Sequence, residues 1–261
     1  MKSLYINTRS VKQSAGLTSL LLTKAAEVLE LPLLEMKEAE GIKELADEIA
    51  SIDWILFTSA NAVDIFYDYI QRNNILLPET VRFAAIADKT AKVISEKSLN
   101  LEFVSSNADA RSFATEFVKF LTDNQQSEKK VLLLRGDKAD PSIVDIFLAS
   151  EIKVRDLIIY QTVFNQLEEE KKEKLLSLII GPKQRDLVFI FTSGSSFDAL
   201  IFNLSNNLRM QPEKMKLFID DCSLAAIGPK TAEHIQSKGY VAKFVAPEQS
   251  VESLVKTLFE V

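Results

Sequence analysis

The chain has 261 residues, 47% of them hydrophobic and 26% charged, which is the composition of an ordinary globular protein with room for two domains. Its formal net charge of −6 argues against a general nucleic-acid binder, because such a protein needs a basic face. The single cysteine, Cys222, rules out an internal disulfide and fits a reducing compartment, so we expect a cytoplasmic protein. We expect no membrane association, since no uncharged run approaches the roughly 18 residues of a membrane helix and the start shows no signal peptide.

Short β-rich runs alternate with helical patterns along the chain, which predicts parallel sheets covered by helices. In chain order, the predicted strands are Leu4–Asn7, Leu31–Met36, Trp54–Phe57, Phe83–Ile86, Glu102–Val104, Val131–Leu134, Leu157–Val163, Val188–Phe191, Leu224–Ile227 and Lys243–Val245. Two helix starts are marked by residues typical of that position, Ser250 as N-cap and Pro229 in a first turn. The charged segment 168–174 suits a solvated helix face.

Two blocks of the sequence occur twice. Residues 53–60 (DWILFTSA) return as 186–193 (DLVFIFTS), and residues 84–91 (AAIADKTA) return as 225–232 (AAIGPKTA). Both pairs keep the same order, and a weaker match relates 4–9 to 131–135. A period this long indicates two whole domains of one design rather than a solenoid.

The repeat predicts two lobes that are not consecutive in sequence. Each front part ends in an apolar strand, near 31–37 or 157–163, and we expect these strands to cross between the lobes. One lobe would then contain residues 1–34 plus 165–261, and the other residues 35–164. Two similar lobes make a cleft, which is where ligands usually bind.

Hydroxyl side chains recur at the carboxyl ends of the predicted strands. Thr58 with Ser59, and Thr192 with Ser193, each follow a buried strand and open a helix, while Thr90 and Thr231 lie in the first turn after the next strand. This edge of a parallel sheet binds ligands, and free N–H groups and helix dipoles there favour anions. Singly, each hydroxyl is best explained as an N-cap. As matched pairs facing one cleft, they favour a polyanionic ligand.

Other kinds of chemistry lack support. None of the seven glycines forms a nucleotide-binding loop. The single histidine, His234, has no partner for a zinc site or a catalytic triad, and Cys222 is best interpreted as an inert core residue. No acidic cluster has metal-ligand spacing, so we expect no metal and no cofactor.

The whole pattern resembles the uroporphyrinogen-III synthase family. The residues that carry the resemblance are Thr8-Arg9, Phe57–Val63 (FTSANAV), Tyr160-Gln161-Thr162 and Ile227–Ala232 (IGPKTA). Each motif alone is weak, but their order and spacing together are specific, and the similarity extends over essentially the whole chain.

The resemblance implies a fold and an activity. The fold would be two flavodoxin-like α/β lobes joined by two antiparallel linker strands. The enzyme would be a lyase of haem biosynthesis that cyclises hydroxymethylbilane to uroporphyrinogen III, with loss of water and inversion of the terminal ring. It would need no cofactor, act as a monomer, and accept its substrate by transient hand-over from hydroxymethylbilane synthase.

The resemblance also implies roles for particular residues. Tyr160 would be the catalytic acid that protonates the departing hydroxyl, unless it only packs against its apolar neighbours on the strand. The carboxylate arms of the substrate would bind at Arg9, Thr58, Ser59, Asn61, Thr90, Ser193, Gly228, Lys230 and Thr231.

Two departures concern the middle lobe. Ala87 stands where the family usually has glycine, and Asp88 adds a negative charge near a supposed carboxylate site. The helix that follows lacks the glycine that Gly239 supplies in the second copy, and Asn100 is the expected left-handed cap.

Three other functions fit the same sequence pattern. They are a two-lobed binding protein for another anion, a non-catalytic family member that serves as an interaction module, and a nucleotide-binding regulator. Turnover of hydroxymethylbilane would identify the synthase, whereas a bound ligand without turnover would favour the binding protein.

Overall fold

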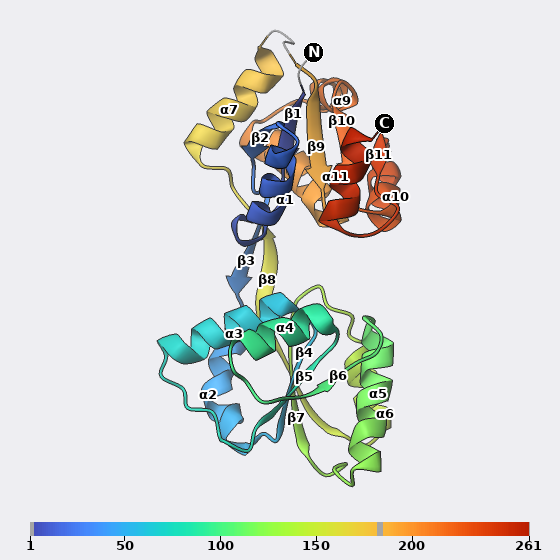
Figure 1. Cartoon of the computed structure of the whole chain (residues 1–261). Helices are drawn as coiled ribbons and strands as arrows, with labels where there is room; N and C mark the ends of the chain where they lie inside the picture. The colour runs from blue at the N-terminus through green and yellow to red at the C-terminus, as the bar shows by residue number, and fades with distance from the viewer. Residues whose placement is uncertain (1–2, 182–184, 261) are drawn as a thin grey trace. The chain divides into compact units, whose positions relative to one another are not determined.

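The structure is a computed structural model that describes residues 3–181 and 185–260 (Figure 1). The chain divides into two compact units, Met1–Glu35 with Val163–Val261, and Met36–Thr162. The divisions predicted from the sequence lie at 34/35 and 164/165.

The first unit contains a five-stranded parallel sheet. Its strands are β1 (Leu4–Asn7), β2 (Glu27–Glu30), β9 (Leu187–Phe191), β10 (Ser223–Ala226) and β11 (Phe244–Val245). They lie in the order β11-β10-β9-β1-β2, and every pairing is parallel. Numbered within the unit, this is the flavodoxin-like order 2-1-3-4-5.

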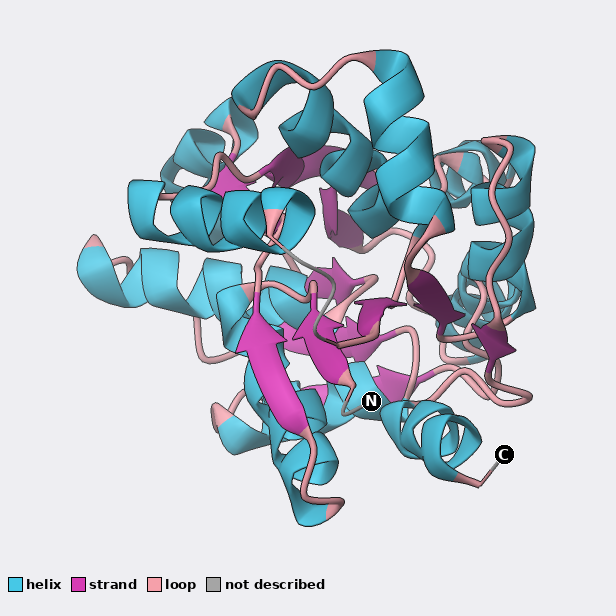
Figure 2. Cartoon of the chain, turned by 90° about the horizontal axis from the view of Figure 1, so that it is seen from above, coloured by secondary structure: helices cyan, strands magenta, loops and turns pink. Residues whose placement is uncertain are grey.

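Helices cover both faces of this sheet. Figure 2 shows helices lying around the strands of the chain. One face packs with residues of α7 (Glu169–Ile180), α8 (Gly194–Phe202), α9 (Pro212–Asp220) and α10 (Pro229–Ser237). The other face packs with residues of α1 (Val11–Thr23) and α11 (Val251–Phe259). Alternation along each strand explains the two cores, because Ile6 faces one layer of helices and its neighbour Tyr5 faces the other.

The second unit contains a six-stranded sheet in the order β3-β8-β7-β4-β5-β6. Its strands are β3 (Leu34–Glu38), β4 (Trp54–Phe57), β5 (Arg82–Ala85), β6 (Leu101–Val104), β7 (Lys130–Gly136) and β8 (Lys153–Phe164). β4 to β8 pair in parallel. If β7 is counted first and the antiparallel β3 is left out, the five parallel strands again have the order 2-1-3-4-5, so the second unit is a circularly permuted copy of the first.

The helices of the second unit also form two layers. Residues of α2 (Leu45–Glu48), α3 (Ala60–Arg72) and α4 (Asp88–Glu96) pack on one face, and residues of α5 (Ala110–Asp123) and α6 (Ser142–Ala149) pack on the other. Short 3-10 turns at Glu40–Glu44 and Ile49–Ser51 flank α2, and a π-helical turn, Asn203–Asn207, follows α8 in the first unit.

The fold class predicted from the sequence is confirmed. Two parallel α/β sheets are present, and β3 runs antiparallel to β8. The direction follows from two hydrogen bonds, Asn165 N–H to Leu33 O at 2.9 Å and Ala39 N–H to Ile159 O at 3.0 Å, because residue numbers fall on one strand as they rise on the other.

One strand was not predicted, and the ends of several others differ from the prediction. β2 gave no signal, because Glu27 and Glu30 bracket only two apolar residues on an edge strand. β8 is longer than the predicted Leu157–Val163, and most other strands begin or end one to three residues away from the prediction.

The predicted left-handed cap at Asn100 is wrong. Ser98 takes that conformation, with φ of 56°, and corresponds to Gly239, with φ of 83°, in the second copy. Among the residues described here, no helix has both the length and the apolar character that crossing a membrane demands.

Candidate functional site

The carboxyl end of β4 carries the first predicted pair, Thr58 and Ser59. Ser59 is the N-cap of α3, and its Oγ accepts a hydrogen bond from the N–H of Ala62 at 3.2 Å. This is the ordinary use of serine at a helix start, and it places the positive end of the α3 dipole beside Ser59.

Tyr160 on β8 contacts the same serine. Its Oη lies 3.1 Å from Ser59 Oγ, although 101 positions separate the two residues. The Tyr160 side chain is almost buried, with 9% of the residue exposed. The β7–β8 register shifts between Arg135 and Gly136, so that Gly136 lies opposite Tyr160. Irregularities of this kind change the direction of a side chain, which brings the phenol to the carboxyl edge of the sheet.

A cavity of about 250 Å³ opens at this edge, and every residue that lines it belongs to the second unit. Thr58, Ser59 and Tyr160 line it, so the structure brings together three of the predicted residues. Several other residues that line the same cavity were not predicted, namely Gly136, Asp137, Lys138, Asp140 and Thr162. For Gly136, Asp137, Lys138 and Asp140 the available signal was the end of β7, because ligands bind at the carboxyl ends of parallel strands, whereas Thr162 belongs to the segment on β8 that carries the family resemblance.

The loop after β7 is tied to both sides of Tyr160. The N–H of Asp137 donates to the carbonyl oxygen of Tyr160 at 3.0 Å, and Asp137 Oδ1 accepts from the N–H of Thr162 at 3.1 Å. Arg135 holds the end of β7 against β8 through two hydrogen bonds to Asp156, at 2.8 and 2.7 Å. These hydrogen bonds therefore fix the β8 backbone before and after Tyr160.

The start of α4 lies on the same sheet edge, one strand away. Thr90 is only 3% exposed, so its hydroxyl is not open to a ligand, and its backbone N–H donates to the carbonyl of Ala87. Ala87 is the N-cap and supplies no side-chain hydrogen bond. Asp88 lies in the first turn, where its charge favours the helix but opposes a carboxylate ligand. Asn61 lies in the first turn of α3.

The first unit presents the corresponding edge at β9 and β10. Ser193 is the N-cap of α8, and its Oγ accepts from the N–H of Ser196 at 3.2 Å. Gly228 is the N-cap of α10 in an extended conformation that any residue adopts. Lys230 is exposed in the first turn of α10, whereas Thr231 is 5% exposed.

Arg9 follows β1, the strand next to β9, and its side chain is half-buried. Burial lowers the pKa of its guanidinium, and the nearby Glu252 carboxylate opposes that shift. Its Nη2 lies 3.4 Å from Gln13 Oε1, and its buried Nε has no hydrogen-bond partner among the described residues. The Arg9 guanidinium is thus less accessible to a ligand than that of a fully exposed arginine.

His234 forms a contact that the sequence did not indicate. Its Nε2 lies 2.9 Å from Asp198 Oδ1, and its ring covers Gly194, where an added Cβ would lie 2.5 Å from the ring. Lys238 lies 3.6 Å from the same carboxylate, as Lys97 lies 3.4 Å from Asp64 in the other copy. The repeat thus preserves an ion pair between equivalent helices.

The predicted site residues divide between the two units. Those at the carboxyl edge of the second unit are Thr58, Ser59, Asn61, Thr90 and Tyr160, and those at the carboxyl edge of the first unit are Arg9, Ser193, Gly228, Lys230 and Thr231.

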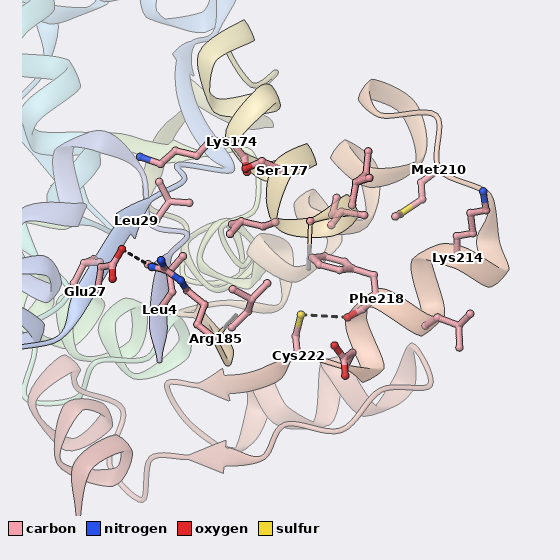
Figure 3. Close-up of a pocket in the computed structure, with 18 residues that line it drawn as sticks. Leu4, Glu27, Leu29, Lys174, Ser177, Arg185, Met210, Lys214, Phe218 and Cys222 are labelled. Atoms are coloured by element: carbon pink, nitrogen blue, oxygen red, sulfur yellow. Dashed lines mark hydrogen bonds and ion pairs between the residues drawn. The ribbon is translucent and has the colours of Figure 1, made fainter. Parts of the chain in front are cut away.

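A larger cavity, of about 790 Å³, lies at the amino ends of β1, β2 and β9 in the first unit (Figure 3). Lys174 on α7 and Lys214 on α9 lie on opposite sides of it, and Arg185 pairs with Glu27 at 2.5 Å. None of the predicted site residues lines it. Helices of parallel α/β sheets begin at the opposite edge, so volume alone does not make this cavity the reaction site.

Comparisons with known proteins agree on one family. A family model described as uroporphyrinogen-III synthase HemD matches residues 16–258. The porphyrin biosynthesis protein HemD of Ruminiclostridium josui is 27% identical over 262 residues, which cover 97% of this chain and 47% of that protein. The chain therefore spans about half the length of that relative. A putative uroporphyrinogen-III synthase of Methanocaldococcus jannaschii is 26% identical, with 97% of this chain and 98% of that protein covered.

Two solved structures share the fold. The uroporphyrinogen-III synthetase of Helicobacter pylori 26695 aligns with a TM-score of 0.65 and 18% identity, covering 100% of this chain and 99% of that one. A mutant uroporphyrinogen III synthase of the extremely thermophilic bacterium Thermus thermophilus aligns with a TM-score of 0.55 and 14% identity, covering 100% of this chain and 98% of that one. The family model extends over most of the sequence, and the chain belongs to the uroporphyrinogen-III synthase HemD family.

Proposed function

We propose that this chain is a uroporphyrinogen-III synthase, a lyase that converts hydroxymethylbilane to uroporphyrinogen III and water. Family membership supports the reaction class. The observation that carries the proposal at the level of the site is the phenol of Tyr160, which lies at the carboxyl edge of a parallel sheet, 3.1 Å from the serine that caps α3.

The first chemical step needs an acid. The Tyr160 O–H donates its proton to the terminal hydroxyl of the bilane, directly or through a water; the C–O bond breaks and water leaves. The substituted carbon of the pyrrole ring at the other end of the bilane then attacks the resulting azafulvene cation and forms a spiro intermediate. The spiro intermediate then fragments and recloses with that ring inverted. The closing pyrrole carbon loses a proton, which restores the phenol, so that the net change is the loss of one water.

Inversion of the ring depends chiefly on shape. The enzyme has to hold the bilane folded so that the inverted closure is faster than simple head-to-tail closure. The substrate carries eight carboxylates, and helix starts with free N–H groups suit such anions. We assign this role to the helix starts after β4, β5, β9 and β10, with Lys230 adding charge. Thr90 and Thr231 take part by holding the first turns of these helices, because both side chains are buried and their own N–H groups donate to the carbonyls of Ala87 and Gly228.

The test is a coupled assay. Hydroxymethylbilane is generated from porphobilinogen by its synthase, the chain is added, and the oxidised products are separated into type I and type III uroporphyrin. We expect a type III excess. Type I alone, from protein shown to be folded, refutes the proposal and favours an anion-binding protein with the same fold.

We further propose a cytoplasmic monomer that receives its substrate by transient hand-over from hydroxymethylbilane synthase. The single cysteine fits a reducing compartment. Light scattering during size exclusion tests the monomer. To test the hand-over, the rate with hydroxymethylbilane synthase present is compared with the rate on hydroxymethylbilane that has already been released from it. Equal rates at equal substrate concentration would contradict the hand-over.

A further inference from the structure

Tyr160 is held by two residues that act on it from different sides. Ser59 forms a hydrogen bond with its oxygen, and Gly136 faces its ring. Both line the cavity described above. Their arrangement suggests that each of them positions the Tyr160 phenol.

The hydrogen-bond capacity of Ser59 allows it to donate to Tyr160. A serine hydroxyl has one proton to donate and two lone pairs. Ser59 Oγ accepts from the N–H of Ala62, at 3.2 Å, and its own proton remains for Tyr160 Oη at 3.1 Å. With that direction, the phenol proton points away from Ser59, as an acid that serves a substrate requires. If Tyr160 were instead the donor in this hydrogen bond, the phenol proton would point at Ser59 and not at a substrate.

Gly136 provides the space for the ring. A Cβ at this position would lie 2.5 Å from Tyr160 Cζ and 2.8 Å from Tyr160 Oη, far closer than van der Waals contact. The backbone does not require glycine, because Gly239 alone among the described glycines has a left-handed φ. The absence of a side chain at Gly136 therefore serves the phenol and no turn.

We propose that Ser59 and Gly136 are positioning residues for Tyr160, and that Ser59 relays the positive end of the α3 dipole to the phenol oxygen. This inference rests on the proposed function. When Tyr160 gives its proton to the departing hydroxyl and water leaves, the phenolate oxygen accepts a hydrogen bond from Ser59, which in turn accepts from Ala62 N–H. The charge thus develops next to aligned donors, which stabilise it more than they stabilise the neutral phenol. Ser59 is then not a carboxylate ligand.

A double-mutant cycle tests the relay. Ser59→Ala should lower kcat about ten-fold with KM unchanged, because it removes a hydrogen bond to a charged group. In a Tyr160→Phe background, which by itself costs about a hundred-fold, the same change should have no further effect. Ser59→Thr, which keeps the hydroxyl, should restore kcat. Losses that multiply in the double variant, or a rise in KM from Ser59→Ala alone, overturn the relay and make Ser59 a direct substrate ligand.

Loss of a helix cap needs its own control. Ser250 caps α11 in the same way, its Oγ accepting from the N–H of Ser253 at 3.1 Å, and it forms no hydrogen bond to a tyrosine among the described residues. Ser250→Ala should lower the melting temperature as Ser59→Ala does and leave kcat unchanged.

A spectroscopic readout separates this inference from the proposed function. The chain has five tyrosines, so 3-fluorotyrosine labelling gives five fluorine resonances, and Tyr160→Phe identifies one. Ser59→Ala and Gly136→Ala should each shift that resonance, and Ser250→Ala should not. A resonance that stays in place in both variants overturns the inference. A wild-type chain that makes no type III product refutes the proposed function, and with it the role in proton donation, whatever the spectra show. An active wild type with multiplying losses refutes only the relay.

Discussion

Ser59 and Ser193 occupy equivalent positions in the repeat, and both cap a helix in the same way. Of these two serines, Ser59 alone forms a hydrogen bond with a tyrosine phenol in the described part of the chain. The two serines thus share the capping role, and Ser59 has a further hydrogen-bond partner on β8. The comparison separates what a hydroxyl does for its helix from what it does for the site.

We expect Ser193→Ala to weaken activity several-fold rather than abolish it. The proposed substrate site is spread over several helix starts, so that no single cap would carry binding. The lost cap should also cost about 1 kcal/mol of unfolding free energy. Steady-state kinetics and urea unfolding of the variant check both expectations. Complete loss of activity in a folded variant would contradict distributed binding.

Glu116 on α5 stabilises the loop that follows β6. Its carboxylate accepts from Ser105 Oγ at 2.9 Å, from Ser106 N–H at 2.8 Å, from Ser106 Oγ at 2.6 Å and from Asn107 Nδ2 at 3.1 Å. The hydrogen bonds from Ser106, followed by those from Ser105 and Asn107, lower the pKa of Glu116 from 4.5 to about 2. The unfolded chain then binds this proton at a higher pH than the folded chain, so the contribution to stability is complete above about pH 5 and disappears as the pH falls toward 2.

Glu116→Gln should therefore lower the unfolding free energy by about 1 kcal/mol at pH 7, and the difference from wild type should vanish near pH 2. Urea titrations at several pH values measure it. Glu79→Gln, at an exposed acid without such donors, is the control and should change little at any pH. A difference that persists unchanged at pH 2 would show that the effect does not come from the ionised carboxylate.

At the scale of helices, the two copies end α4 and α10 with the same geometry. Ser98 N–H donates to Ser95 O and Leu99 N–H to Ile94 O, as Gly239 and Tyr240 do in the other copy. The left-handed residue is serine in one copy and glycine in the other. Glycine adopts this conformation at little cost, whereas a residue with a Cβ does not.

Ser98→Gly should accordingly stabilise the protein by about 1 kcal/mol. The matched variant is Gly239→Ser, which should destabilise it by a similar amount, since no atom lies within 4 Å of an added Cβ and only backbone strain differs. Thermal and urea unfolding measure both. Effects of equal sign in the two variants would contradict the assignment of Ser98 as the equivalent cap.

Sequence patterns predicted the strands that carry the site but not the contacts between them. The buried runs ending at Phe57 and Phe191 have a strong signal, because central parallel strands are apolar on both faces. β2 has only two apolar residues, so its pattern is too short to stand out. The pairing of Ser59 with Tyr160 and the place of Gly136 beneath the ring depend on the packing of β7, β8 and α3, which no local pattern records.

At the scale of the whole chain, each unit contains its own cores. The buried clusters around Phe66 and Trp54 draw only on the second unit, and those around Phe197 and Leu254 draw only on the first. Domains with separate cores generally fold alone. The second unit is continuous in sequence, whereas the first needs segments from both ends of the chain.

We expect a fragment of residues 34–164 to unfold cooperatively in urea. The single tryptophan, Trp54, is fully buried in this unit and reports on it alone. A fragment of residues 163–261 should not fold, because it lacks β1 and β2 of its sheet. A gradual, non-cooperative transition of the 34–164 fragment would contradict the independence of the second unit.

The central proposal is that this chain closes hydroxymethylbilane to uroporphyrinogen III with Tyr160 as the acid. The ratio of type III to type I product tests it most directly. The measurement compares the wild type and Tyr160→Phe side by side on the same freshly generated hydroxymethylbilane. We predict that the wild type forms mainly type III uroporphyrinogen and that Tyr160→Phe forms it about a hundred-fold more slowly at unchanged KM. Equal rates would remove Tyr160 from the chemistry, and type I product alone from the folded wild type would contradict the account as a whole.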